Sequence, residues 1–260
     1  MKHFFYNEIP TTLDEVFNIF TKNRPNNEPV LVTSLRMTKG RGRVGKCWHA
    51  NKDGNLHMSL AFNHLSFPIL TSLPIVTVTS VGNMLNLPNI KGFCYKWPND
   101  LFVDNKKFGG VLIEIKDNVF IIGVSVNIHY TPIVNNAEVT SLASKNCLNI
   151  LGNNILSLDL GKQMFYISEL IASDILSNLE KISGNNTNAA TDAILTHANL
   201  WRKNCWKRIG DKITIKLSAV KSKEYIFKGI CDDCLILVEE LDEAGNGNGN
   251  IVSLSYGDVS

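Results

Sequence analysis

The sequence has no apolar run long enough to cross a membrane and no large excess of charge of one sign. Its first ten residues, "MKHFFYNEIP", lack the sustained apolar stretch of a secretion signal, and no later run approaches the length that spans a bilayer. The net charge of the 260 residues is +2, which gives no electrostatic reason to expect nucleic acid or an anionic membrane as a partner. We therefore expect a globular cytoplasmic protein that binds neither nucleic acid nor membranes.

The cysteines are scattered, and their spacing supports neither a disulfide framework nor a zinc site. The chain has six cysteines, and only Cys231 and Cys234 stand in a C-x-x-C arrangement. A zinc site of this kind needs a second pair, and a redox motif sits at a helix start within a βαβ pattern; the sequence shows neither context. We interpret "CDDC" as an acidic turn between two strands, and we expect no disulfides and no dedicated cluster of metal ligands.

The periodicity of apolar residues predicts two parts of different character. In the first part, a capping-box pattern at Thr12–Glu15 predicts the start of a helix, residues 69–87 a buried helix, and residues 160–182 a long amphipathic helix. In the second part, short strand-like segments separated by turns predict a small β module. The expected fold class is α+β, with a mixed sheet and packed helices in a domain at residues 1–207, followed by a β domain at residues 208–260.

The stretch "GRGRVGKC", residues 40–47, matches the spacing of two phosphate-binding templates. Both templates need a strand before the glycines and a helix after them, and the following "KCWHANKDGN" shows no helical spacing. A P-loop also needs Ser or Thr after its lysine, where this chain has Cys47, a soft ligand that Mg²⁺ avoids. What remains is a flexible basic loop with Arg41, Arg43 and Lys46. On this stretch alone, a lid over an anion and an exposed surface loop are equally good interpretations.

A second stretch, "KWPNDL", places two polar side chains next to a proline. Pro98 fixes its own backbone and restricts the residue before it, so the chain is held where Asn99 and Asp100 project. This arrangement suits a rigid mount for two hydrogen-bonding side chains. The simpler interpretation is a turn after a strand, because Pro-Asn-Asp is common turn chemistry.

Two further polar residues follow along the chain. In "NKKFGGVLIE", Lys107 precedes two glycines that let a ligand approach the backbone while the ammonium group meets its charge; an exposed hairpin lysine is the simpler interpretation. Asn127 lies at the end of the apolar run 119–128, which predicts a central strand. Binding sites in sheets often lie at the end of such a strand.

In combination and in this order, these stretches resemble one family. A basic Gly loop, "KWPND", Lys-x-x-Gly and Gly-x-x-x-Asn ahead of a small β module are similar to the biotin protein ligases over about residues 10–260, and "SYGDVS" resembles their closing strand. The resemblance implies a class II aminoacyl-tRNA synthetase-like catalytic domain and an SH3-like barrel, in the monofunctional form without an N-terminal DNA-binding domain. It also implies an enzyme that activates biotin with ATP to biotinyl-5'-adenylate and transfers biotin to a lysine of a biotin carboxyl carrier domain.

The resemblance assigns roles to the residues that match the family's motifs, with ATP, biotin and Mg²⁺ as the expected ligands. It implies that the residues around the reacting centre are Lys107, Asp100, Arg41 and Arg43. The biotin contacts that it implies are Thr11, Thr12, Met37, Gly40, Arg41, Gly54, Asn55, Lys107 and Gly110. The contacts to ATP or the adenylate that it implies are Arg41, Arg43, Gly45, Trp48, Asn99, Lys107 and Asn127.

The sequence departs from the family pattern at three positions. Met37 stands where Gln is usual, Ser125 where Gly is usual in Gly-x-Gly-x-Asn, and Cys234 in place of a turn glycine. None of these removes a charged residue of the mechanism, so we expect activity with altered ligand affinity. Two alternatives stay open: an acyl-adenylate ligase of the lipoate protein ligase kind, and a non-catalytic biotin- or nucleotide-binding protein. Monomer and homodimer are equally compatible with the sequence.

Overall fold

Two separate β-sheets organise the chain. The protein is described by a computed structural model that covers residues 1–22, 28–63, 70–135, 137–184, 187–216, 221–255 and 257–259. The strands of the first sheet are β1 (Lys2–Ile9), β2 (Val30–Met37), β3 (Leu56–Asn63), β4 (Phe93–Lys96), β5 (Asp100–Val103), β6 (Lys106–Lys116) and β7 (Val119–Val126). Those of the second are β8 (Lys212–Lys216), β9 (Ser222–Ile230), β10 (Ile236–Leu241), β11 (Gly247–Leu254) and β12 (Asp258–Val259).

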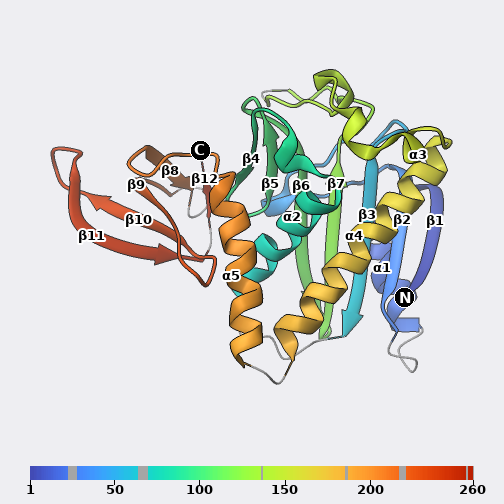
Figure 1. The fold of residues 1–260 in the computed structure, drawn as a ribbon, viewed down its shortest axis with the longest axis horizontal. Coiled ribbons are helices and arrows are strands. Elements are labelled where there is room, and N and C mark those ends of the chain that lie inside the picture. Colours follow the sequence, from blue (N-terminus) through green and yellow to red (C-terminus); the bar gives the residue numbers. More distant parts are fainter. Residues whose placement is uncertain are drawn as a thin grey trace.

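The large sheet is mixed, with strand order β1-β2-β3-β7-β6-β5-β4 (Figure 1). β1 pairs with β2 in parallel, and the remaining neighbours pair antiparallel. β1 was not expected from the sequence, because its side chains are only half-buried at the edge of the sheet and show no clear alternation. The predicted central strand is β7, which lies between β3 and β6.

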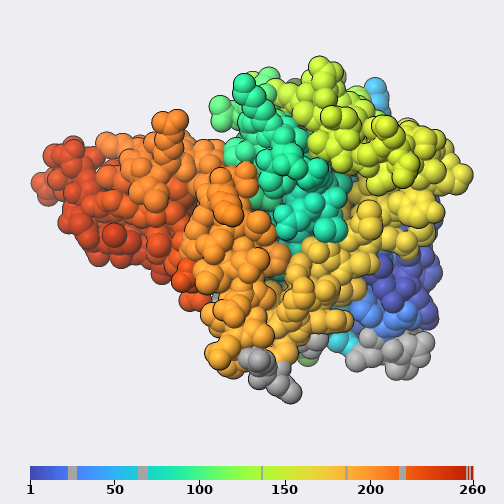
Figure 2. All heavy atoms as spheres, viewed as in Figure 1, coloured from blue at the N-terminus to red at the C-terminus, as the bar shows by residue number. Residues whose placement is uncertain are grey.

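Helices cover both faces of the large sheet. α1 (Thr12–Lys22) packs on one face, where Phe20 and Ile121 are buried in one cluster. α2 (Leu73–Met84), α4 (Leu160–Ser183) and α5 (Thr187–Lys203) lie on the other face, which they cover closely in Figure 2. Because β7 is buried on both sides, neighbouring residues such as Ile121 and Ile122 enter different cores, which explains the continuous apolar run.

The two long helical predictions are confirmed. α4 spans Leu160–Ser183 and begins after Asp159, whose side chain accepts a hydrogen bond from the backbone of Lys162. α2 is the predicted buried helix, although it ends at Met84 rather than at residue 87, and residue 69 lies outside the described residues. Pro74 stands in its first turn, where a missing N–H leaves no helical hydrogen bond unmade.

The predicted capping box at the start of α1 is wrong. Thr11, not Thr12, caps this helix, because the Thr11 hydroxyl accepts a hydrogen bond from the backbone N–H of Leu13 at 3.4 Å. Thr12 is already helical, and its hydroxyl faces Met37 and Ser59 instead. The predicted capping partner, Glu15, accepts a hydrogen bond from the Tyr6 hydroxyl at 3.0 Å.

The small sheet has the strand order β11-β10-β9-β8-β12 and packs beside α5 (Figure 1). "CDDC" forms the predicted turn between β9 and β10, and the Trp97 indole donates a hydrogen bond to the Cys234 carbonyl at 3.1 Å. The Gly-Asn stretch "GNGN" at residues 247–250 forms the start of β11. The expected closing strand is present as β12, while Tyr256 and Ser260 lie outside the described residues.

The expected fold class is therefore confirmed: a mixed sheet with packed helices is followed by a smaller β-sheet. The exact domain boundary near Arg208 stays a prediction. Among the described residues, no helix is both long enough and apolar enough to span a bilayer.

Candidate active site

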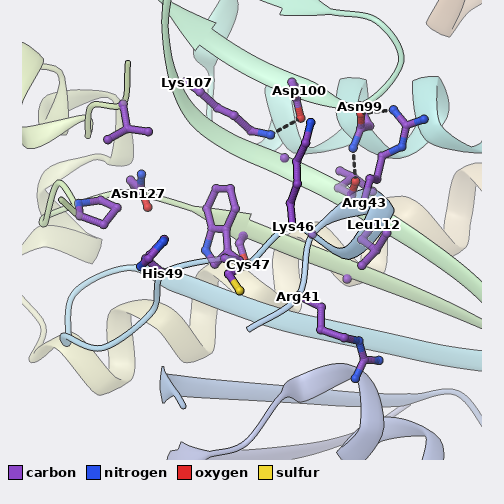
Figure 3. A pocket seen from close by; sticks show the side chains of 18 of the residues that line it. Arg41, Arg43, Lys46, Cys47, His49, Asn99, Asp100, Lys107, Leu112 and Asn127 are labelled. Atoms are coloured by element: carbon purple, nitrogen blue, oxygen red, sulfur yellow. Dashed lines mark hydrogen bonds and ion pairs between the residues drawn. The ribbon is translucent and has the colours of Figure 1, made fainter. Parts of the chain in front are cut away.

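A cavity of about 680 Å³ lies against the large sheet at the N-terminal end of α1, within the size range of sites for small molecules. The basic loop, β5, β6, β7 and the segment after Asn127 all contribute to its wall (Figure 3). Most residues that the sequence singled out meet here although they come from distant segments: Thr11, Thr12, Met37, Arg41, Arg43, Trp48, Asn99, Asp100, Lys107, Gly110 and Asn127.

Lys107 and Asp100 form an ion pair at the cavity wall, with Nζ and Oδ1 2.6 Å apart (Figure 3). Both side chains are partly buried, 31% and 21% exposed respectively, so solvent screens the pair less than a surface pair. The Lys107 ammonium also lies 5.7 Å from the centre of the Trp48 ring, within reach of a cation–π interaction. A carboxylate, a cation and an aromatic face are thus held together at one point of the cavity.

The basic loop forms a short hairpin rather than leading into a helix. The Trp48 N–H donates to the Gly40 carbonyl at 2.9 Å, and the Gly42 N–H donates to the Lys46 carbonyl at 2.6 Å. Gly40 is required for this closure, since a Cβ there would lie 2.3 Å from the Trp48 carbonyl oxygen. The next regular strand is β3, so the prediction that the loop is neither a dinucleotide-binding turn nor a P-loop is confirmed.

The two arginines of the loop point in different directions. Arg43 donates to the Asn99 side-chain oxygen at 3.2 Å and to the Gly257 carbonyl at 3.2 Å, so it joins the loop to both the turn before β5 and the small sheet. Arg41 instead binds Asp14 at 2.7 Å and Glu114 at 3.1 Å, and Figure 3 shows its guanidinium directed away from Lys107. The hydrogen bond to Asp14 raises the pKa of Arg41 above its ordinary value.

Two buried asparagines hold the chain at the end of β7. The Asn55 side-chain oxygen accepts from the backbone N–H groups of Ile128 and Tyr130, both at 3.0 Å. Its amide donates to the Tyr130 carbonyl at 2.8 Å and to the Asn127 side-chain oxygen at 3.3 Å, and the Asn127 amide donates to the Thr140 carbonyl at 3.1 Å. The polar atoms of the Asn55 side chain thus hold the backbone that carries Asn127.

Four predicted site residues do not line the cavity: Gly40, Gly45, Gly54 and Asn55. Gly40 and Asn55 have the structural roles just described. Gly45 ends a short 3₁₀ turn at the tip of the loop, and the Gly54 carbonyl accepts from the backbone of His129 at 3.1 Å. These four residues therefore support the segments that form the cavity wall without lining the cavity themselves.

The departure at Met37 changes the pattern of contacts at the start of α1. The Met37 sulfur accepts from the backbone N–H and the hydroxyl of Thr12, at 3.5 and 3.6 Å. Ser59 donates to the Thr12 hydroxyl at 2.7 Å. A thioether sulfur carries no hydrogen to donate and is only a weak acceptor. Met37 therefore offers the cavity no hydrogen-bond donor.

Several residues that line the cavity had no role assigned from the sequence. Lys46 was named only as a basic residue of the loop, Lys96 belongs to "KWPNDL" without a role of its own, and the segment 132–139 carries no motif. This segment reaches the cavity because the Lys107 N–H donates to the Glu138 carbonyl at 2.9 Å. Among the described residues, those that line the cavity include two with carboxylates, Asp100 and Glu138, and five with basic side chains: Arg41, Arg43, Lys46, Lys96 and Lys107. Arg41 is already paired with Asp14 and Glu114, and the remaining basic excess favours anionic ligands.

Comparisons of sequence agree with this geometry. Residues 9–130 match the model of the Biotin/lipoate A/B protein ligase family. The chain is 27% identical over 139 residues to the bifunctional ligase/repressor BirA of Bacillus subtilis, an alignment of 50% of this chain and 42% of the relative. It is 25% identical over 119 residues to the biotin–[acetyl-CoA-carboxylase] ligase of Mycobacterium tuberculosis, an alignment of 44% of each chain. The matches thus span about two fifths of these curated relatives.

Comparisons of structure extend over the whole chain and support the fold. The biotin protein ligase of Aquifex aeolicus in complex with biotin and ATP superposes with a TM-score of 0.72 and 22% identity, over 100% of this chain and 97% of that one. The biotin protein ligase of Leishmania major with biotinyl-5-AMP gives 0.57 and 20%, over 98% and 99%. Residues 9–130, the segment that matches the model of the biotin/lipoate A/B protein ligase family, carry the basic loop, Asp100, Lys107 and Asn127.

Proposed function

We propose that this protein is a biotin protein ligase, which activates biotin with ATP and transfers it to a lysine of a biotin carboxyl carrier domain. The observation that carries the proposal is the convergence of Lys107, Asp100, Arg43 and Trp48 on one cavity in a chain that matches the model of this family. The names of the relatives from Bacillus subtilis and Mycobacterium tuberculosis favour biotin as the acid.

In the first step, a biotin carboxylate oxygen attacks the α-phosphorus of ATP and pyrophosphate leaves. Two anions must approach each other, so the step depends on positive charge at the reacting centre. The Lys107 ammonium, at the wall of a cavity with an excess of basic side chains, supplies that charge. Trp48, whose ring lies beside Lys107, supplies an aromatic face for the nucleotide base.

In the second step, a lysine amine attacks the acyl carbon of biotinyl-5'-adenylate and AMP leaves. An amine with a solution pKa near 10.4 is almost fully protonated at neutral pH, so it needs a group that positions it and accepts its proton. Asp100 is that group in our proposal. Its carboxylate pairs with Lys107 here, and it becomes available when the ligand phosphate attracts Lys107.

The mixed anhydride must also be protected from water. Arg43 ties the basic loop to Asn99 and to Gly257, the residue before β12, and these contacts support a role for the loop as a lid across the cavity. We propose that Arg41 exchanges its partners Asp14 and Glu114 for the ligand when the lid closes. Among the described residues, no three or more His, Cys, Asp or Glu side chains are placed to hold a metal, so Mg²⁺ would enter as its complex with ATP.

The decisive experiment is exchange of labelled pyrophosphate into ATP with purified protein, Mg²⁺ and biotin, lipoate or no acid. Exchange with biotin alone is the expected result. Exchange with lipoate would favour the lipoate ligase alternative, and no exchange despite measurable biotin binding would favour a non-catalytic binding protein. Lys107→Ala should abolish exchange, whereas the matched variant Lys106→Ala should retain it, because Lys106 is absent from the cavity wall and pairs with Glu138.

A further inference from the structure

Four residues lie side by side across the large sheet, and three of them, Asp100, Gly110 and Ser125, line the cavity. Asp100 on β5 is opposite Gly110 on β6, Gly110 is opposite Ser125 on β7, and Ser125 is opposite His57 on β3. Directly opposed residues of neighbouring strands present their side chains on the same face of a sheet. Gly110 contributes no side chain between the Asp100 carboxylate and the Ser125 hydroxyl, and a Cβ there would lie 3.0 Å from Asp100 Oδ1 and 3.4 Å from Lys107 Cε.

His57 is buried behind Ser125 and holds its hydroxyl. The imidazole is fully buried, and its Nδ1 lies 3.2 Å from Ser125 Oγ. Its Nε2 is buried and has no hydrogen-bond partner among the described residues. Burial lowers the pKa of His57 to about 3, so the ring is neutral at physiological pH and fixes the hydroxyl as either donor or acceptor.

The Ser125 hydroxyl retains hydrogen-bonding capacity toward the cavity. A hydroxyl has one donor and two acceptor sites, and His57 takes one of them. Ser125 is only half-buried and lines the cavity, and its cross-strand neighbour Gly110 has no side chain to cover it. Met37 offers no donor on the same cavity wall, because its sulfur faces Thr12. The hydroxyl of Ser125 is therefore a polar group placed for a ligand.

We propose that Ser125 is a specificity-determining residue, whose hydroxyl donates or accepts a hydrogen bond with the bound acid substrate, and that His57 is the positioning residue that orients this hydroxyl. The inference rests on the proposed function, since the acid is taken to be biotin. It predicts that the couple acts on binding of the acid and leaves binding of ATP unchanged.

The test measures biotin affinity by calorimetry without ATP, together with the KM values for biotin and ATP in pyrophosphate exchange. Ser125→Ala should weaken biotin binding and raise its KM about 3- to 10-fold, the usual worth of one hydrogen bond, with KM for ATP and kcat unchanged. Unchanged or tighter biotin binding would overturn the inference, as would an equal effect on ATP. If the wild-type protein shows no exchange with biotin, the proposed function fails instead, so the two failures are distinguishable.

Variants of His57 test the positioning role. His57→Phe fills the buried site but orients nothing, and should raise the KM for biotin as Ser125→Ala does; in the Ser125→Ala background it should add no further effect. His57→Asn keeps a hydrogen-bonding group near the position of Nδ1 and should restore most of the biotin affinity. Thermal unfolding shows whether His57→Asn is folded. If the folded variant still binds biotin as weakly as Ser125→Ala, a positioning role for His57 is contradicted.

Discussion

Burial of His197 should make the protein sensitive to acid through its stability. His197 on α5 is 4% exposed, and its Nδ1 lies 2.7 Å from the Thr79 hydroxyl of α2. Burial lowers the pKa of His197 from its ordinary value of 6.5 to about 4, with Asp174 opposing the decrease and Lys181 adding to it. Between these two pH values, the unfolded chain takes up a proton at this residue while the folded protein does not.

The sign and size of the effect follow from linkage. A proton bound only by the unfolded state favours unfolding, so the free energy of unfolding falls as the pH falls from 6.5 toward 4. With the two pKa values above, His197 alone should cost about 2 kcal/mol between pH 7 and pH 5. That is a large part of the stability of an ordinary domain.

Urea unfolding of the wild type and of His197→Asn at pH 7, 6 and 5 measures this contribution. The variant loses stability at pH 7, because it leaves a gap in the core. The stability difference between the two proteins should then shrink by about 2 kcal/mol on going from pH 7 to pH 5. Parallel curves for the wild type and His197→Asn would refute the reasoning.

Three further predictions concern the cavity. Arg43→Gly removes the hydrogen bonds to Asn99 and Gly257 and should let the adenylate escape from the site. The escaped adenylate would attach biotin to bystander proteins, which a streptavidin blot detects. An unchanged blot would mean that the loop is not the lid. Gly110→Ala places a Cβ 3.0 Å from the Asp100 carboxylate and should raise the KM for biotin about tenfold without a large change in melting temperature. An unchanged KM would contradict a close approach of biotin to the Gly110 backbone. Asn55→Ala leaves two backbone N–H groups without their acceptor and should lower the free energy of unfolding by about 2 kcal/mol. A loss below 0.5 kcal/mol in urea unfolding would contradict the role of Asn55 in holding this backbone.

Elements with a strong periodic pattern could be predicted, and those with a weak one could not. α4 and β7 were expected because their apolar residues follow the period of a helix or form a continuous run. α5 was missed because its buried face is built partly from small or polar residues, such as Ala190, His197 and Ala198. Such a face packs well against α2 and α4, yet it leaves no apolar stripe in the sequence.

The sequence by itself determined which residues are present for chemistry, since the glycine-rich basic loop and the segments around Asp100 and Lys107 are local patterns. Their order along the chain was enough to indicate the family. Local patterns also indicated that no helix follows the loop, because helical spacing is a property of neighbouring residues.

Only the tertiary structure decided what these residues contact. Strand register places Ser125 between Gly110 and His57, folding pairs Lys107 with Asp100, and Arg41 at the cavity wall pairs with Asp14 and Glu114. It also shows that Asn55, expected at the ligand, instead supports the backbone behind it. These contacts join residues far apart in the chain, and a pairing of that kind depends on sheet order and side-chain direction, which no short stretch of sequence specifies.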